Sequence, residues 1–194
     1  MSAGKRSFVS TIVYMCIGGG IIFAAVFFGV RAGLAVRTSG VLGIDPNNLT
    51  NNTQLVIGQK LPEIQVFSNT TPERPLHELY QNTNTVVAFL MPGCGPCAEL
   101  LTRWRLKQLS KKAEGYQVIL VAATSADLND ISEITELGGE FPIYMCDFVS
   151  LNMATGIETF PTIFGIKRDG SIVFISSGYN QYIENDFFRE TFDR

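Results

Sequence analysis

The sequence predicts an α/β domain with a mixed β-sheet flanked by helices, preceded by one N-terminal transmembrane helix. Three observations lead to this prediction. Short apolar runs alternate with helical patterns after residue 61, an Asp-Gly pair separates the last two runs, and 19 of the first 30 residues are hydrophobic. Strands that alternate with helices favour parallel pairing, whereas an Asp-Gly turn joins antiparallel strands, so the sheet is expected to be mixed.

Residues 8–30 are the predicted membrane anchor. They run for 23 positions without a formal charge, between Lys5 and Arg6 on one side and Arg31 on the other. A helix of this length spans about 34 Å, which is enough to cross a bilayer core of about 30 Å. A cleaved signal peptide is the alternative, but its apolar core runs for only about 7–15 residues. We therefore expect a short N-terminal tail (1–7) and a single-pass signal-anchor in the cytoplasmic membrane, with the soluble domain on the extracytoplasmic side.

Residues 31–57 are predicted to be a tether, because they are rich in Gly, Asn and Thr and show no regular periodicity. Residues 58–194 then form the domain. From residue 31 onward the chain holds 13 basic and 18 acidic side chains, since two of the 15 Lys and Arg residues precede that point. This balance provides no basic surface for phosphate groups, so no nucleic-acid partner is expected.

The elements of the domain follow from apolar runs and helical spacing. Continuous apolar runs predict strands buried on both sheet faces, and leucine and isoleucine at helical spacing predict amphipathic helices that end at glycine. Asp169-Gly170 lies between two runs and predicts a hairpin with a two-residue turn. Strands are expected at 64–67, 85–91, 117–123, 141–146, 162–167 and 171–176, and helices at 96–113, 127–137, 149–154 and 183–192, with a helical turn at 75–80.

The motif Cys94-Gly95-Pro96-Cys97 carries the chemistry. It follows the predicted strand 85–91 and opens the predicted helix. Unpaired N–H groups and the positive end of the helix dipole stabilise an anion at that point, so we expect a lowered pKa for Cys94, which makes it the thiolate nucleophile. Cys97, one turn further on, is placed to attack a mixed disulfide on Cys94. Gly95 allows the turn, and Pro96 pre-sets the first helical turn.

Zinc sites also use two cysteines separated by two residues, and a structural zinc ion takes four ligands. Cys146 and His77 are the only other obvious ligands, and their spacing is unrelated to the motif. The strand before the motif and the helix after it favour a redox pair. We therefore expect no metal and no separate cofactor, because a redox-active disulfide between Cys94 and Cys97 itself carries the electrons.

Three segments carry a family resemblance: the Cys-Gly-Pro-Cys motif, Gly58-Gln59-Lys60-Leu61-Pro62, and Phe160-Pro161-Thr162 before the predicted hairpin. Together they resemble the thioredoxin superfamily, and within it the membrane-anchored TlpA/ResA-like thiol-disulfide oxidoreductases. The resemblance implies a thioredoxin-like fold in which Pro161 is cis and lies against the cysteine pair. It also implies that Phe160 and Pro161 bind the substrate, with the Phe160 backbone pairing to an incoming peptide.

The same resemblance predicts an activity and its partners. It implies a membrane-tethered, extracytoplasmic enzyme that reduces disulfides of exported cysteine-containing proteins, for example in cytochrome c maturation, with electrons from a membrane donor. The direction of electron flow depends on a reduction potential that four residues do not encode.

Two positions depart from that family. Pro92-Gly93 stands where the family has Trp before the first cysteine, and Ala88 stands where thioredoxins carry a buried Asp. These departures keep a second hypothesis open, a membrane-anchored thioredoxin-like binding module or chaperone with a non-catalytic cysteine pair. A peroxiredoxin is a third hypothesis, but it needs Thr or Ser three residues before its reactive cysteine, and Met91 holds that position before Cys94.

Five further residues are interpreted as structural or solvated. Cys146 is expected to be a buried thiol rather than an extra redox partner, and Cys16 a cysteine within the membrane. Trp104 is expected in the core. His77 and Glu99 are expected to be solvated helix residues, although Glu99 is also considered as a proton acceptor for the motif.

Overall fold

The computed structural model describes residues 53–106, 115–126, 129–183 and 185–193. A five-stranded sheet of mixed direction lies at its centre, which confirms the α/β prediction. Within these ranges no helix is long and apolar enough to cross a membrane, and the expected tail, anchor and first part of the tether (1–52) lie outside them. The sheet has the order β5-β4-β3-β6-β7, formed by β3 (Asn84–Leu90), β4 (Tyr116–Thr124), β5 (Ile143–Asp147), β6 (Thr162–Ile166) and β7 (Ile172–Ser177).

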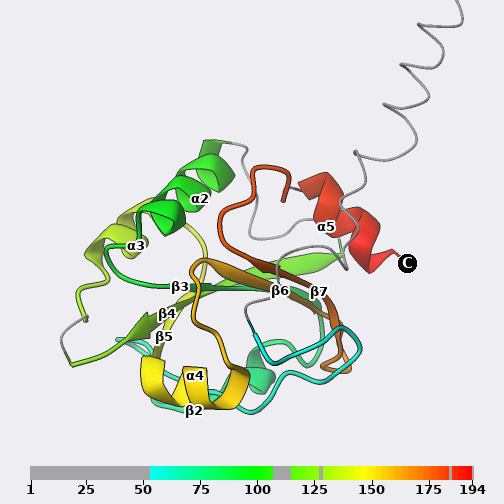
Figure 1. Cartoon of the computed structure of the whole chain (residues 1–194), viewed down its shortest axis with the longest axis horizontal. Helices are drawn as coiled ribbons and strands as arrows, with labels where there is room; N and C mark the ends of the chain where they lie inside the picture. Colours follow the sequence, from blue (N-terminus) through cyan, green and yellow to red (C-terminus); the bar gives the residue numbers. More distant parts are fainter. Residues whose placement is uncertain (1–52, 107–114, 127–128, 184, 194) are drawn as a thin grey trace, which may run out of the picture. The chain divides into compact units, whose positions relative to one another are not determined.

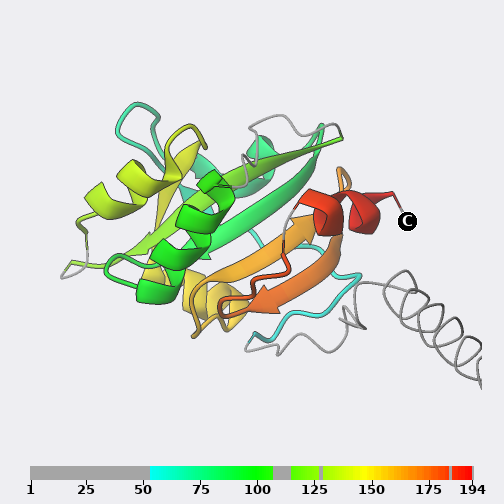
Figure 2. The same cartoon turned by 90° about the horizontal axis from the view of Figure 1, so that it is seen from above.

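Helices cover both faces of the sheet. Figures 1 and 2 show α2 (Gly95–Leu106), α3 (Ser132–Gly138) and α5 (Asn185–Phe192) on one face, whereas α4 (Phe148–Thr155) lies on the other. The central strand β3 is buried on both sides. Val86, Ala88 and Leu90 belong to the core under α2, and Val87 and Phe89 belong to the core under α4. This explains why the strand reads as an uninterrupted apolar run.

Strand pairing brings two distant segments to the same edge of the sheet. β3 is parallel to β4 but antiparallel to β6, and Phe89 near the end of β3 lies opposite Thr162 at the start of β6. The segment after β3 and the segment before β6 therefore meet. These are the segments that contain Cys94 and Pro161.

The predicted hairpin is present, but the prediction that Asp169 and Gly170 form its two-residue turn is wrong. The carbonyl of Lys167 accepts a hydrogen bond from the N–H of Gly170 (2.8 Å), so Arg168 and Asp169 are the central residues of the turn. Gly170 follows them with a φ of +87°. A three-residue connection of this kind places glycine at the left-handed position after the turn.

The expected helix 127–137 begins later than predicted. α3 starts at Ser132, residues 127–128 lie outside the described ranges, and Asn129–Ile131 are not helical. The carboxylate of Asp130 accepts a hydrogen bond from the N–H of Ser132 (2.9 Å), a local contact that competes with helical geometry. The helix predicted at 96–113 is present as α2, and its positions 107–113 lie outside the described ranges.

The other elements agree with the prediction apart from one short strand. The helical turn is the 3₁₀ helix η2 (Leu76–Leu79), and the first strand is β1 (Gln65–Val66). β1 pairs with β2 (Arg74–Pro75), which was not predicted because two residues that include a proline show no alternation.

Residues 53–57, placed in the predicted tether, pack on the domain. The Thr53 hydroxyl and the Gln54 N–H both donate to the carbonyl of Thr155 at the end of α4. Leu55 is buried in the core, and the N–H of Gly58 donates a hydrogen bond to the carbonyl of Ile172 on β7 (2.8 Å). These residues therefore pack on the domain, although the sequence pattern placed them in the tether.

Candidate active site

Cys94 and Cys97 form a disulfide at the start of α2. Their Cα atoms are 5.2 Å apart, one turn along the chain. Cys94 is partly exposed, and Gly95 and Pro96 are exposed, whereas Cys97 is only 1% exposed. Only the Cys94 sulfur can therefore meet an incoming partner without rearrangement, as expected for an attacking cysteine with a buried resolving cysteine behind it.

Backbone N–H groups at the start of α2 point toward Cys94. The N–H of Cys97 donates to the Sγ atom of Cys94 (3.2 Å), and the N–H of Ala98 donates to its carbonyl oxygen (3.1 Å). Cys94 thus occupies the place of a helix-capping residue, with sulfur as the acceptor. In the reduced protein the same donor and the positive end of the helix favour a thiolate on Cys94.

The peptide bond between Phe160 and Pro161 is cis, and this loop lies against the cysteine pair. The Sγ atom of Cys94 is 3.7 Å from the carbonyl oxygen of Phe160. Two contacts hold the loop in place: the N–H of Gly178 donates to the Pro161 carbonyl (2.7 Å), and the Thr162 hydroxyl donates to the carbonyl of Thr159. The structure therefore brings the predicted site residues into one region, with the Phe160 carbonyl beside Cys94 and Pro161 next in the same loop.

Phe160 also connects the two halves of the core. Its partly buried side chain packs against both hydrophobic clusters, one on each face of the sheet. Its ring lies 6.1 Å from the ring of Phe148, the first residue of α4. Sequence patterns did not point to Phe148 or Gly178, because their relation to the motif exists only in the folded chain.

No protein-family model and no curated protein sequence matches the chain. Solved structures do match. A Chlorobium tepidum protein described as the thiol:disulfide interchange protein DsbE superposes with a TM-score of 0.58 at 21% sequence identity, over 71% of this chain and 96% of that one. The thioredoxin domain of a thiol-disulfide oxidoreductase from Bacteroides vulgatus gives a TM-score of 0.59 at 15% identity, over 72% of this chain and 99% of that one. The fold is thioredoxin-like.

No aromatic residue precedes Cys94, and the backbone of Gly93 is consistent with this. Gly93 has a φ of +70°, in a turn closed by a hydrogen bond from the N–H of Cys94 to the carbonyl of Met91 (3.3 Å). Glycine adopts this left-handed conformation readily, whereas a tryptophan in the same backbone would be strained. The residue that approaches Cys94 from across the site is Phe160, through its backbone carbonyl.

The interior of the thioredoxin-like site carries no acid at the position where an Asp is common. Ala88 is fully buried on β3 and belongs to the same hydrophobic cluster as Cys97. Glu99 is exposed on α2, as expected for a solvated helix residue. The proton that Cys97 releases therefore has no buried carboxylate at position 88 to accept it.

Cys146 and Trp104 are core residues of the thioredoxin-like domain, as predicted. Cys146 is 1% exposed and belongs to the cluster under α4, on the face of the sheet opposite Cys97. Burial, and to a lesser extent the charge of Asp147, raises the pKa of the Cys146 thiol to about 12. Trp104 is fully buried, and its indole N–H donates to the carbonyl of Ile183 (3.0 Å).

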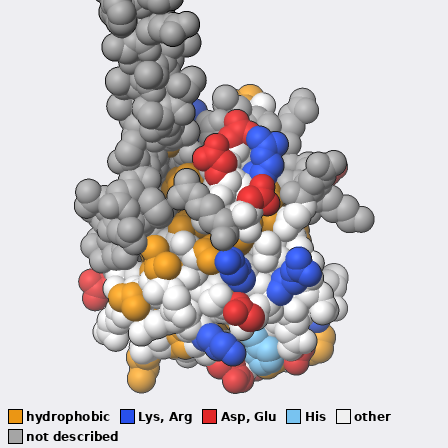
Figure 3. All heavy atoms as spheres, turned by 90° about the vertical axis from the view of Figure 1, so that its right-hand side faces the viewer, with side chains coloured by type: hydrophobic (Ala, Val, Ile, Leu, Met, Phe, Trp, Pro, Cys, Tyr) orange, Lys and Arg blue, Asp and Glu red, His pale blue; other side chains and the backbone are white. Residues whose placement is uncertain are grey.

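His77 lies apart from the cysteine motif. It lines a cavity of about 330 Å³ together with residues of the β6–β7 turn, including Arg168 and Asp169. Figure 3 shows the histidine on the surface among Lys, Arg and acidic side chains. Within the described ranges, no three His, Cys, Asp or Glu side chains are grouped as a metal site. Cys146 belongs to the core cluster under α4, whereas Cys97 belongs to the cluster under α2.

Proposed function

We propose that this protein is a thiol-disulfide oxidoreductase that works through Cys94 and Cys97. The observation that carries the proposal is the arrangement around Cys94. Cys94 is partly exposed at the start of α2, and its sulfur accepts the N–H of Cys97 and lies 3.7 Å from the carbonyl oxygen of Phe160, which precedes the cis bond to Pro161. The thioredoxin-like fold and the described activities of its structural neighbours support the same conclusion.

The exchange needs only the two cysteines and the partner. In the reducing direction, the Cys94 thiolate attacks one sulfur of a partner disulfide, forms a mixed disulfide and displaces one partner thiolate. The Cys97 thiolate then attacks the Cys94 sulfur, which releases the second partner thiolate and forms the Cys94–Cys97 disulfide. Two electrons pass to the partner, and water takes up or supplies the protons. Oxidation of a partner dithiol is the reverse sequence.

The cis-proline loop supplies the binding surface in this proposal. A cis bond before proline turns the backbone of Phe160 outward, where its N–H and carbonyl can pair with an extended peptide. The Phe160 carbonyl lies beside the reacting sulfur, so a peptide paired there places its own cysteine close to Cys94. Proximity of this kind lowers the barrier to exchange.

We further propose where the protein acts. Residues 8–30 are long and apolar enough to anchor the chain in the cytoplasmic membrane, and residues 31–52 tether the domain on the extracytoplasmic side. Disulfides form and persist in that compartment. Its partners are then exported cysteine-containing proteins, as in cytochrome c maturation, and a membrane electron donor returns the enzyme to its reduced form.

A binding module or chaperone with a non-catalytic cysteine pair is the second candidate. The glycine at position 93 and the alanine at position 88 favour it, because they remove two groups that assist catalysis in thioredoxins. Such a module has no need of a reactive thiolate, so a pKa above about 8 for Cys94 would favour it over catalysis.

The test combines turnover with redox titration. The full chain in detergent is assayed for reduction of a model disulfide, and the midpoint potential and thiol pKa of the cysteine pair are measured. We expect turnover that Cys94→Ser abolishes and that the matched control Cys146→Ala retains. Turnover that survives Cys94→Ser would overturn the assignment of the nucleophile. A stable pair without turnover in either direction would favour the binding module.

A further inference from the structure

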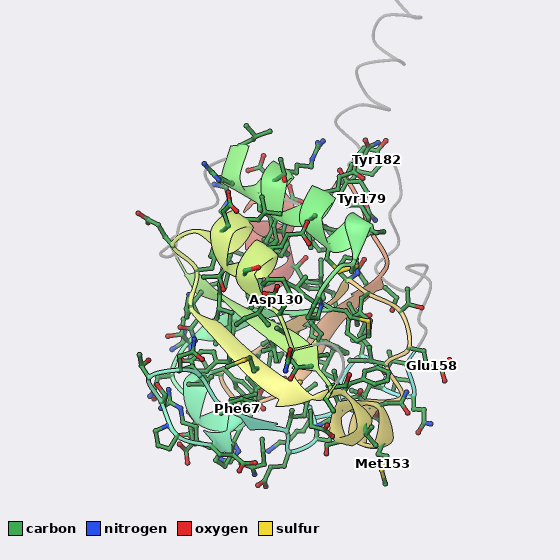
Figure 4. The ribbon with its side chains drawn as sticks, turned by 90° about the vertical axis from the view of Figure 1, so that its left-hand side faces the viewer. Phe67, Asp130, Met153, Glu158, Tyr179 and Tyr182 are labelled. Atoms are coloured by element: carbon green, nitrogen blue, oxygen red, sulfur yellow. A yellow bond between two sulfur atoms is a disulfide. The ribbon has the colours of Figure 1, made fainter. Side chains whose placement is uncertain are left out.

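Helix α4 presents an apolar face to solvent. Val149 and Met153 lie four residues apart, hence on the same side of the helix, and are 57% and 80% exposed. None of the eight residues of α4 carries a charge. Figure 4 shows Met153 pointing away from the body of the domain. These two side chains, beside the exposed Ala154, provide apolar contact area on α4.

The first turn of α4 lies next to the cis-proline loop. Phe148, at the start of α4, is partly buried and packs its ring 6.1 Å from the ring of Phe160. The Phe160 carbonyl in turn lies 3.7 Å from the Sγ atom of Cys94. We call Phe148, Val149, Met153 and Phe160 the α4 surface: Phe148 and Phe160 connect α4 to the loop beside the reacting sulfur, and Val149 and Met153 are its exposed apolar side chains.

The surroundings of the α4 surface are acidic. Asp147 precedes α4 and Glu158 follows it, and both are exposed. Figure 4 shows Glu158 at the right-hand side of the domain, above Met153 at its lower end. Hydrogen bonds from the N–H and hydroxyl of Ser150 lower the pKa of Asp147, so this carboxylate is charged at neutral pH. The sequence has no Lys, Arg or His between residues 113 and 166. A partner with positive charge is therefore favoured, and an anionic lipid surface is disfavoured.

The α4 surface is held in one position before any partner arrives. The Asn152 amide donates to the carbonyl of Ile157 (3.0 Å), and the N–H of Gly156 donates to the carbonyl of Asn152 (2.7 Å). The segment before β1 is also bonded to the last residue of α4, because the N–H of Gln54 donates to the carbonyl of Thr155 (3.0 Å). A preformed surface avoids the cost of ordering on binding.

We propose that the α4 surface docks an apolar, basic segment of the protein whose disulfide exchanges with Cys94. The inference rests on the proposed exchange activity and specifies its substrate class. The substrates are proteins or peptides with apolar and Lys or Arg side chains near the reacting cysteine, rather than small disulfides. Contact with Phe160 orients the cysteine, and contact with Val149 and Met153 selects the chain that carries it.

The test compares three disulfides with the full chain in detergent. Two peptides of equal length each hold one internal disulfide, flanked by Leu and Lys in one and by Ser and Asp in the other. Hydroxyethyl disulfide is the small probe. We expect Met153→Asp and Val149→Asp to lower kcat/KM about tenfold for the Leu/Lys peptide and to change the hydroxyethyl disulfide rate less than about twofold. Glu158→Lys is expected to remove the preference for the Leu/Lys peptide.

Two variants serve as controls. Met153→Leu keeps an apolar side chain and is expected to retain full activity on the Leu/Lys peptide. Leu106→Asp places the same charge at a residue that is 78% exposed on α2, on the other face of the sheet, and is expected to change nothing.

Several outcomes would overturn the inference. An equal loss on all three disulfides would indicate general damage, and no loss on any of them would leave the α4 surface without a role in docking. Dissociation of a dimer by Met153→Asp in sedimentation would assign the surface to a second copy of the chain. Failure of the unaltered chain to exchange any disulfide, including hydroxyethyl disulfide, would instead contradict the proposed function itself.

Discussion

The Sγ atom of Cys94 lies 3.7 Å from the carbonyl oxygen of Phe160, although 66 positions separate the two residues in the chain. The same sulfur accepts the N–H of Cys97 at 3.2 Å. Cys94 is therefore placed between a helix N-terminus, which favours its thiolate, and the cis-proline loop, which we propose holds the partner peptide.

Cys97→Ser is expected to trap a mixed disulfide between Cys94 and its partner. Cys97 is 1% exposed and lies one turn from Cys94, so it is the group placed to resolve the intermediate. Serine cannot attack the mixed disulfide, and we expect its lifetime to rise at least about 100-fold. Non-reducing electrophoresis and intact mass after incubation with a peptide disulfide measure the adduct. Release of the partner at the unaltered rate would exclude Cys97 as the resolving group.

Cys146 is expected to resist alkylation in the folded protein. Its thiol pKa of about 12, against an ordinary value of 9.0, lowers the thiolate fraction at pH 8 by about 1000-fold. Iodoacetamide treatment of the reduced protein, followed by peptide mass spectrometry, should label Cys94 first and Cys146 only in denaturant. Native labelling of Cys146 as fast as Cys94 would contradict its burial.

The free energy of unfolding is expected to fall as the pH rises from about 9 to about 12. The folded state keeps the Cys146 proton up to about pH 12, whereas the unfolded state releases it near pH 9. Between these values deprotonation stabilises the unfolded state relative to the folded state. In Cys146→Ala, the free energy of unfolding should decrease less steeply with pH above pH 9. Tyr116→Phe should have the same effect only above pH 10, because burial raises the Tyr116 pKa from 10.0 to about 12. Urea titrations of the oxidised protein across this range provide the measurement, and an unchanged slope in Cys146→Ala would count against the prediction.

Gly93→Ala is expected to destabilise the protein by about 1 kcal/mol. The φ of +70° at Gly93 lies in the left-handed region, where a side chain costs about 1–2 kcal/mol. Gly95→Ala is the matched comparison, because Gly95 is also exposed and has open space around it but lies in α2. Alanine favours a helix, so this variant should not lose stability. Equal effects of the two substitutions in urea denaturation would show that φ at Gly93 is not the cause.

Trp104→Phe is expected to cost about 1–3 kcal/mol. The substitution removes the indole N–H that donates to the carbonyl of Ile183 (3.0 Å) and leaves that carbonyl without this donor. It also alters the edge-on packing of Trp104 against Phe141 and Phe188. Because Trp104 is the only tryptophan, unfolding is followed by circular dichroism. Tyr182→Phe, at a 56% exposed residue, should stay within about 0.5 kcal/mol of the unaltered protein.

Much of the sheet could be predicted because burial on both faces leaves a mark on local sequence. The apolar run at 85–91 corresponds to β3 (Asn84–Leu90), and the run at 117–123 corresponds to β4 (Tyr116–Thr124). The ends of elements were less predictable where a side chain competes with the backbone. The Asp130 carboxylate accepts a hydrogen bond from the N–H of Ser132, and α3 begins only at that residue. In the same way, the Asp169 carboxylate accepts a hydrogen bond from the N–H of Ser171 (2.9 Å) beside the hairpin turn.

The sequence by itself determined that a cysteine pair opens a helix directly after a buried strand, because strand, turn and helix are adjacent in the chain and depend on local patterns. Only the tertiary structure decided what faces that pair. The register of β3 on β6 places the Phe160 carbonyl beside Cys94, and the packing of α4 places the ring of Phe148 on Phe160. The same sheet separates Cys146 from Cys97 by assigning them to opposite faces. Register and face follow from contacts between distant segments, and no local periodicity encodes such contacts.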